Sequence, residues 1–247
     1  MRFLVLSDIH ANSTALAAAL AASEGRWERC VCLGDLVGYG PDPNEVVGRV
    51  RDLVDTAIRG NHDKAVCGVK PAEDFNPAAR AAVEWTRSQL LPETLQYLCA
   101  LPAGPVETDG LTLVHGAIHD EDEYVFTPAQ ALDGLLASPS GVTFFGHTHF
   151  QGGFSYREGR LEVIQLRAQP GTGFAALRLE SGTRYLLNPG SIGQPRDGDP
   201  RAAFAIADLD HEVVEFWRVP YDVIAVQQRM HEVGAAEPLV SRLTFGR

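Results

Sequence analysis

Short apolar runs recur along the first three-fifths of the chain, and they alternate with longer segments rich in alanine and leucine. The apolar runs predict buried strands at residues 2–7, 30–33, 55–59, 105–107, 111–114 and 142–145. The longer segments, several of them opened by an asparagine, aspartate or threonine before proline, predict helices at 11–22, 43–53, 77–90, 92–99 and 128–137. The strand and helix alternation up to residue 59 predicts a parallel sheet whose loops gather at one end.

From Phe150 onward the pattern changes to strands and turns. Strands are predicted, in pairs around turn residues, at 152–156 and 161–166, at 173–179 and 184–187, and at 203–207 and 213–219, with a last helix at 222–233. We expect these strands to form the second sheet of one domain. The predicted fold class is α/β, a two-sheet β-sandwich flanked by helices, with residues 1–247 as a single domain.

Polar side chains follow the apolar runs where each predicted strand ends. Five runs end in side chains that bind metals or carry protons, namely Asp8, His10, Asp35, Asn61, His62, His115, His147 and His149. Strands of one sheet deliver such side chains to a common cleft at their carboxyl ends. Oxygen and imidazole ligands without thiolates suit Mn²⁺, Fe, Co²⁺, Ni²⁺ or Zn²⁺ better than Ca²⁺ or Mg²⁺ alone. The pattern therefore predicts a two-metal hydrolytic site, with the metal's identity open.

The charge balance narrows the classes of partner. With 32 acidic and 21 basic residues the formal net charge is -11, which argues against long nucleic acid and anionic membranes as partners. A small phosphorylated substrate remains compatible, because bound divalent cations reverse the local sign of a cleft. The oligomeric state is not readable from the sequence. No apolar stretch is long enough for a signal-peptide core or a membrane span, so we expect a cytoplasmic protein.

The four cysteines are Cys30, Cys32, Cys67 and Cys99, and they show no paired CxxC spacing. Their contexts are mainly apolar. This usage favours reduced, packed thiols over a disulfide framework or a zinc cluster.

The order of the motifs is more specific than any single one. Asp8-x-His10, Gly34-Asp35, Gly60-Asn61-His62-Asp63, His115-Gly116 and Gly146-His147-x-His149 follow one another over residues 8–149. In this order they resemble the calcineurin-like metallophosphoesterase superfamily. The segment 188–196, Asn-Pro-Gly-Ser-Ile-Gly-Gln-Pro-Arg, resembles a further element of its small bacterial branch of phosphodiesterases and diadenosine-tetraphosphatase-like proteins.

The resemblance implies a four-layer α/β/β/α fold and assigns roles to the strand-end residues. Asp8, His10 and His149 would hold one divalent metal and Asn61, His115 and His147 a second, while Asp35 bridges both. A metal-bridging hydroxide would then hydrolyse a phosphoester, with Mn²⁺ as the expected metal. His62 would remain free to give a proton or hydrogen bond to the leaving oxygen.

One difference from the protein phosphatases of this superfamily lets us rank the candidate functions. In the serine/threonine protein phosphatases of this superfamily an acid and an arginine follow the bridging aspartate, where this chain has Gly38 and Tyr39. We therefore expect a small phosphodiester or a nucleotide as substrate. The alternatives are a phosphoprotein phosphatase and a catalytically inactive scaffold that keeps the metal site.

Residues that contact the substrate are harder to identify. The candidates are Arg59, His119, Tyr124 and Arg196, because each lies in or beside a motif loop and arginine binds phosphate well. For Arg59, pairing with a nearby acid is an equal alternative. For His119 and Tyr124, ordinary loop polarity is the alternative.

Overall fold

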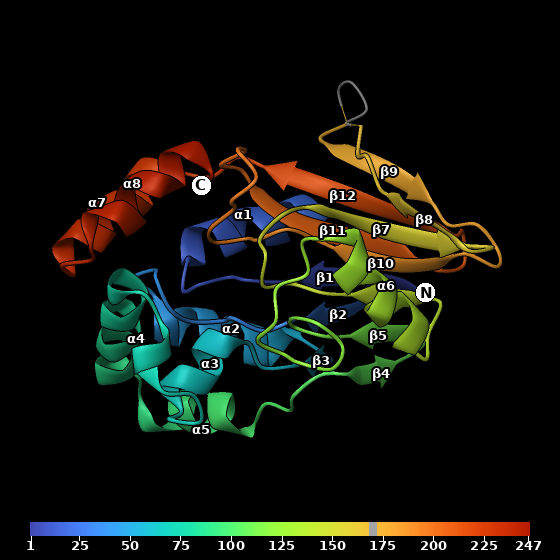
Figure 1. The fold of residues 1–247 in the computed structure, drawn as a ribbon. Coiled ribbons are helices and arrows are strands. Elements are labelled where there is room, and N and C mark those ends of the chain that lie inside the picture. The colour runs from blue at the N-terminus through green and yellow to red at the C-terminus, as the bar shows by residue number, and fades with distance from the viewer. Residues whose placement is uncertain (168–171) are drawn as a thin grey trace.

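The computed structural model describes residues 1–167 and 172–247. Two β-sheets pack face to face, with helices outside them (Figure 1). The first sheet runs, in spatial order, through β3 (Thr56–Ala57), β2 (Arg29–Cys32), β1 (Arg2–Leu6), β11 (Ala202–Asp208), β12 (Val213–Val219) and β9 (Phe174–Arg178). The second runs through β4 (Val106–Thr108), β5 (Leu111–Leu113), β6 (Val142–Phe144), β10 (Arg184–Asn188), β7 (Gly152–Arg157) and β8 (Arg160–Val163).

The alternation of side chains along β1 and β2 explains the layers. Phe3 and Val5 point into the core between the two sheets, where they meet Phe144 and Leu187 of the second sheet. Leu4 and Leu6 point the other way, into a core shared with the helices. Successive residues of a strand face opposite sides of the sheet, so a strand that is apolar throughout is one covered on both faces.

Helices cover the outer faces and form one separate group. The first sheet is covered by α1 (Ser13–Ser23) and α2 (Pro43–Leu53), with contributions from α3 (Asn61–Val66) and α5 (Pro92–Ala100), and α6 (Pro128–Ala137) covers the second. A further apolar cluster joins α4 (Pro77–Gln89), α7 (Val223–Glu232) and α8 (Glu237–Phe245), and the short helix η1 (Ala72–Asp74) precedes α4. Among the described residues we find no helix with the length and apolar character that crossing a bilayer requires.

The layered α/β fold and the parallel β1, β2 and β3 confirm the predicted architecture. The expectation that the C-terminal strands form the second sheet is confirmed for β7, β8 and β10 and wrong for β9, β11 and β12. β11 pairs antiparallel with β1, and β12 and β9 extend that first sheet, while β10 joins the second sheet beside β6. The turn at residues 181–182 therefore connects the two sheets rather than closing a hairpin. The physical signal is in β11, whose residues 202–207 are all buried, as expected for a strand at the centre of a sheet.

Two helices and one cap differ from the predictions. α3 begins directly at Asn61, within a segment expected to lead into an irregular loop, and α8 was not predicted at all. Asp42 precedes α2, but its side chain does not cap that helix. Its carboxylate instead accepts hydrogen bonds from the Ser13 hydroxyl at 2.7 Å and from Arg229 at 2.9 Å, which ties α7 to the body of the protein.

The prediction that all four cysteines are reduced is wrong. Cys67, at the end of α3, forms a disulfide with Cys99 of α5, and their Cα atoms are 5.5 Å apart. Cys30 and Cys32 are free and buried, as expected. The two bonded cysteines are 32 residues apart in the sequence, so no local spacing indicates that α3 and α5 pack against each other.

We expect the disulfide to stabilise the fold. Closing a loop of this length removes chain entropy from the unfolded state worth about 3 to 4 kcal/mol, so Cys99→Ser should lower the free energy of unfolding by that order. The measurement is chemical denaturation of the oxidised protein and of the variant. Alkylation of the unfolded, unreduced protein should modify Cys30 and Cys32 only, and modification of all four thiols without reductant would contradict the disulfide.

Candidate metal centre and substrate cleft

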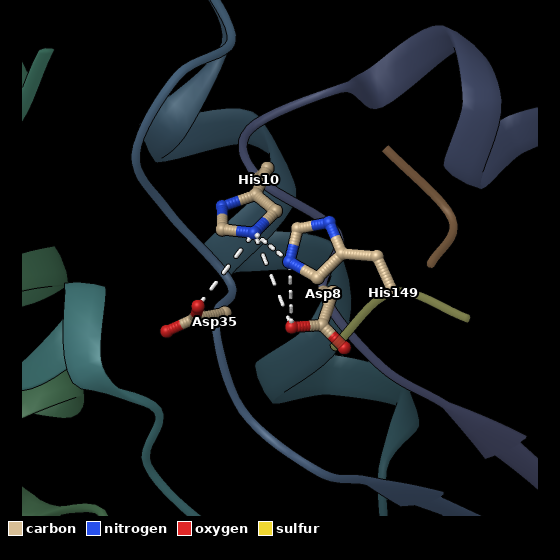
Figure 2. A group of neighbouring side chains, drawn as sticks. All are labelled: Asp8, His10, Asp35 and His149. Carbon is tan, nitrogen blue, oxygen red and sulfur yellow. Dashed lines mark hydrogen bonds and ion pairs between the residues drawn. The ribbon is translucent and has the colours of Figure 1, made fainter. Parts of the chain in front are cut away.

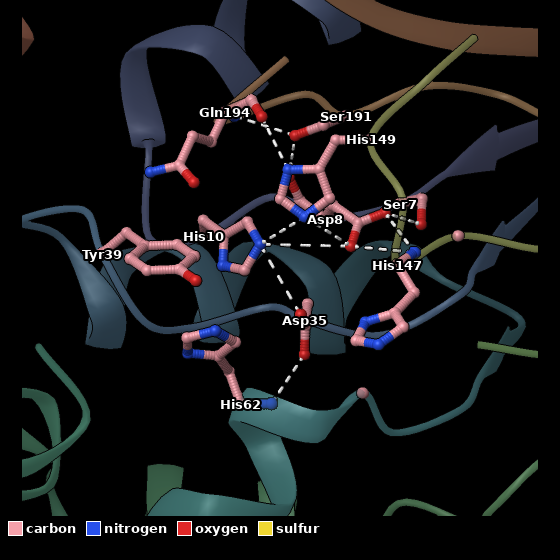
Figure 3. A network of polar contacts seen from close by, with 12 residues as sticks. Ser7, Asp8, His10, Asp35, Tyr39, His62, His147, His149, Ser191 and Gln194 are labelled. Atoms are coloured by element: carbon pink, nitrogen blue, oxygen red, sulfur yellow. Dashed lines mark hydrogen bonds and ion pairs between the residues drawn. The ribbon is translucent and has the colours of Figure 1, made fainter. Parts of the chain in front are cut away.

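The chemistry-bearing residues converge from both sheets. β1 leads to Asp8 and His10 and β2 to Asp35, and Asn61 opens α3 after β3. From the second sheet, β5 leads to His115, and β6 leads to His147 and His149. The carboxyl ends of these strands thus supply one site (Figure 3). The prediction that the strand ends bring these side chains to one place is confirmed.

The side chains form two groups that share one carboxylate. Ligand atoms of Asp8, His10, Asp35 and His149 lie within 4.8 Å of one another, and so do those of Asp35, His115 and His147. Figure 2 shows the first group, in which His149 Nε2 is 3.2 Å from His10 Nε2 and 3.2 Å from Asp8 Oδ1. Asp35 Oδ2 is 3.6 Å from His10 Nε2 and 3.5 Å from His115 Nε2. Asn61 Oδ1 joins the second group, 3.4 Å from His115 Nε2.

Backbone carbonyls fix the orientation of all four imidazoles. The Nδ1–H groups of His10, His115 and His149 donate to the carbonyls of Val37, Leu33 and Gln194, at 3.0, 2.7 and 2.6 Å. His147 is reversed, because its Nε2–H donates to the Asp122 carbonyl at 3.0 Å. The second nitrogen of each ring therefore remains available to a metal within its group, which is the arrangement that hydrogen-bonded metal-ligating histidines adopt.

The donor atoms fit divalent cations. In the first group two imidazole nitrogens face each other at 3.2 Å, although each ring already donates its other N–H elsewhere. Bonds of about 2.1 Å to one cation place neighbouring ligand atoms roughly 3.0 to 3.4 Å apart, close to the separations seen here. Two neutral rings in this arrangement cannot hydrogen-bond to each other, because both facing nitrogens carry lone pairs. A cation bound by both nitrogens would remove this repulsion.

The charges in the site support the same conclusion. Asp8 and Asp35 are 0% and 1% exposed, and within the described ranges neither forms an ion pair with lysine or arginine. Burial opposes the charge of Asp35, but His115 and the other imidazoles hold the pKa of that carboxyl well below its usual range. Burial likewise opposes charge on His115, yet Asp35 raises the pKa of His115 to about 9. Without a cation, a proton on His115 therefore compensates the buried carboxylate, and a cation would take its place.

The backbone carries strain where the ligands lie. Five non-glycine residues at the site have φ in the left-handed region, between 48° and 65°, namely Asp8, His10, Asp35, His147 and His149. That conformation costs about 1 kcal/mol or more for a residue with a Cβ atom. Such strain persists where the surrounding structure enforces it, and it concentrates at functional sites.

Two glycines permit the close approach of the strand ends. A Cβ atom on Gly60 would lie 2.1 Å from Asp35 Oδ1, and one on Gly146 would lie 2.2 Å from Ser7 Oγ and 2.8 Å from Asp8 Oδ2. Packing therefore requires glycine before Asn61 and before His147, because a side chain at Gly60 or Gly146 would displace a carboxylate of the site.

Several supporting residues were not assigned a role from the sequence. Asp63 accepts hydrogen bonds from the backbone N–H groups of Leu36 at 3.0 Å and Gly60 at 2.9 Å, which locks the Asp35 loop to α3. Ser191 donates to the Asp8 carbonyl at 2.7 Å, and Asn188 donates to the Gly146 carbonyl at 2.9 Å. The segment 188–196 is therefore a brace for two ligand loops. A polar side chain directly after an apolar run was the available signal for Asn188.

His62 lies beside the ligands without belonging to either group. Its backbone N–H donates to Asp35 Oδ1 at 2.8 Å, and its ring packs against Tyr39 with a centroid distance of 4.4 Å (Figure 3). Burial lowers the pKa of His62 to about 4, so the ring is neutral near pH 7. The Nδ1 atom has no hydrogen-bond partner among the described residues, and it faces Gly38, where an added Cβ would lie 2.4 Å away.

A cleft of about 200 Å³ opens over the ligands. Asp35, Asn61, His62, His147 and His149 line it together with Lys70, Phe75, Asn76 and Ala79 from the segment that leads into α4. The prediction that this insertion leans over the cleft is confirmed.

The four predicted substrate residues divide into two pairs. Tyr124 and Arg196 line the cleft. Arg59 does not, because Glu121 holds its guanidinium in two hydrogen bonds of 2.8 and 3.1 Å, and His119 is an exposed side chain outside the lining. Arg196 donates at 3.1 Å to Gln194 Oε1, which also accepts from Arg242 of α8 at 3.3 Å.

Known proteins are similar to this chain in sequence and in fold. A relative from Methanocaldococcus jannaschii, an uncharacterized protein, is 33% identical over 249 residues and covers 98% of this chain and 97% of its own length. The crystal structure of a metallophosphoesterase from Sphaerobacter thermophilus is 40% identical, has a TM-score of 0.84 and covers 100% of this chain and 99% of that one. A hypothetical protein from Pyrococcus horikoshii shares the fold, with a TM-score of 0.79, 21% identity and coverage of 100% and 98%.

The family match extends beyond the ligand motifs. The model of the calcineurin-like phosphoesterase superfamily domain matches residues 1–212, which include all seven predicted ligands, His62 and the bracing segment. This span also includes β11, the strand that pairs with β1 in the first sheet. The chain therefore belongs to the calcineurin-like phosphoesterase superfamily.

Proposed function

We propose that the protein hydrolyses a small phosphodiester or a nucleotide at a site that holds two divalent cations. The chain belongs to a superfamily of phosphoesterases and is therefore a phosphoester hydrolase. The number of cations is inferred from Asp35, the one carboxylate common to both ligand groups. Mn²⁺ is our first choice for the metal, and Fe, Zn²⁺, Ni²⁺ and Co²⁺ suit the same donors.

The two ligand groups would divide as the motifs imply. Asp8, His10 and His149 would hold one cation, Asn61, His115 and His147 the other, and Asp35 both. When bound, such a pair of cations lowers the pKa of a water and neutralises charge on the phosphoryl group. The chain itself supplies the alignment, because carbonyls orient the rings and Asp63 holds the Asp35 loop.

Two further residues act on the phosphoester in this proposal. His62 lines the cleft beside Asp35, and its neutral ring would give a hydrogen bond to the leaving oxygen. Arg196 also lines the cleft, and its Nη2 donates to Gln194 and Tyr39. Within the described residues it forms no ion pair with a carboxylate, so its remaining N–H groups would bind a non-bridging phosphate oxygen. Gly38 gives His62 no acidic partner, which supports our preference for a diester or nucleotide over a phosphoprotein.

Asp35→Asn tests the shared carboxylate. The substitution keeps the shape but removes the charge that would serve both cations, so we expect fewer than two tightly bound Mn²⁺ per chain and a kcat/KM at least about 100-fold lower. Bound metal is counted by mass spectrometry of the native protein. Glu158→Gln, a surface substitution, is the control and should keep both values. Two tightly held ions in Asp35→Asn would contradict the bridging role.

Hydrolysis with Mn²⁺ tests the reaction class. We expect turnover of bis-p-nitrophenyl phosphate above that of p-nitrophenyl phosphate and of a phosphoserine peptide, and loss of all three with EDTA. Faster turnover of the phosphopeptide would favour a phosphoprotein phosphatase. Absence of turnover by a protein that retains two Mn²⁺ ions would favour the inactive scaffold.

Arg196→Ala tests the phosphate contact. Loss of a charge-assisted hydrogen bond worth about 1.5 to 3 kcal/mol should raise KM roughly 10- to 100-fold, with the metal content unchanged. Arg160→Ala is the matched control, because that arginine lies on β8 with a side chain that is 83% exposed. An unchanged KM in Arg196→Ala would remove Arg196 from the binding site.

A further inference from the structure

Three exposed aromatic side chains lie in contact, and one of them, Tyr124, lines the cleft. Tyr124, Phe126 and Phe150, here called the aromatic strip, are 39%, 54% and 45% exposed. The rings of Tyr124 and Phe126 are stacked, with centroids 5.4 Å apart and an interplanar angle of 12°. Phe126 meets Phe150 edge to face at 5.7 Å.

The aromatic strip begins on a candidate metal ligand and runs outward. Tyr124 stacks on the His147 ring with a centroid distance of 3.8 Å and an angle of 13°, and it lines the cleft. Tyr124 and Phe126 are two residues apart in a stretch without helix, so both rings can face the same side. Phe150 directly follows His149 in the chain. The strip is thus continuous with the metal centre.

Packing of the core does not account for these rings. The described core clusters include Val125 and Phe154, but none of the three residues of the aromatic strip. Large apolar side chains that gather on a surface mark a binding site more often than single exposed ones do.

We propose that the aromatic strip binds the base of a nucleotide whose phosphate is held at the metal centre, so that the substrate class is nucleoside phosphoesters. This inference rests on the proposed function and narrows its substrate. Tyr124 is stacked on His147, so the ring of Phe126, nearly parallel to it and 54% exposed, offers the flat surface that suits the π-face of a base. A second copy of the chain is a weaker occupant, because three half-exposed rings present on the order of 300 Å², against roughly 800 Å² per partner in a stable interface.

Calorimetry with the Mn²⁺-loaded protein tests the inference through binding rather than turnover. AMP and ribose 5-phosphate carry the same phosphate and sugar, and only AMP carries a base. Stacking on an aromatic side chain is worth about 1 to 3 kcal/mol, so AMP should bind at least about 5-fold more tightly. Phe126→Ala should reduce this ratio at least about 3-fold, and Phe126→Tyr, which keeps the ring, should restore it.

Phe245→Ala is the control, because Phe245 is 60% exposed on α8 and outside the lining of the cleft, and it should leave the ratio unchanged. Equal affinities of AMP and ribose 5-phosphate for the native protein would overturn the inference, as would an unchanged ratio in Phe126→Ala or no binding of either compound. A change in oligomeric state alone, measured by light scattering, would assign the strip to a protein interface and overturn it too. If diesters are hydrolysed while the two affinities are equal, the proposed function stands and only the base site fails.

Discussion

The site depends on two carboxylates that the fold removes from water. Asp8 and Asp35 are almost completely buried, and a charge in that position requires opposite charge and hydrogen bonds nearby. The hydrogen bonds are present, from the His62 backbone to Asp35 and from the His147 backbone and the Ser7 hydroxyl to Asp8. When no cation is bound, a proton on His115 supplies part of the opposite charge, because Asp35 raises the pKa of that ring. Divalent cations bound by these side chains would supply more of it.

Keeping the carboxylates there costs backbone strain, and the surrounding structure offsets it. The left-handed residues at the ligand positions would relax if their loops were free. Hydrogen bonds hold these loops in place. Asp63 binds the Asp35 loop, Ser191 binds the Asp8 loop, and Asn188 binds the loop at Gly146. The residues that brace the ligands therefore come from a helix next to the site and from a strand end far along the chain.

The sequence was sufficient where chemistry and local pattern coincide. Asp8 and His10, like His147 and His149, follow an apolar run. The run predicts where these side chains lie, and their residue types indicate what they can bind. Local pattern was insufficient where pairing between distant elements decides. It did not show that β11 inserts beside β1, that Cys67 meets Cys99, or that Glu121 holds Arg59 away from the cleft. In each case the two segments are distant in the sequence, and neither contains a local pattern that predicts contact with the other.

The distribution of charge around the cleft follows from this arrangement. The chain as a whole is acidic, with a net charge of -11, so a long polyanion would be repelled by most of its surface. The cleft differs locally, because Arg196 lines it and cations bound by the ligands would add positive charge there. A small anion is drawn into such a site only once it is close, since charges are screened beyond about 10 Å. If cations bind there, an acidic surface around a positively charged site would favour small anions over long ones.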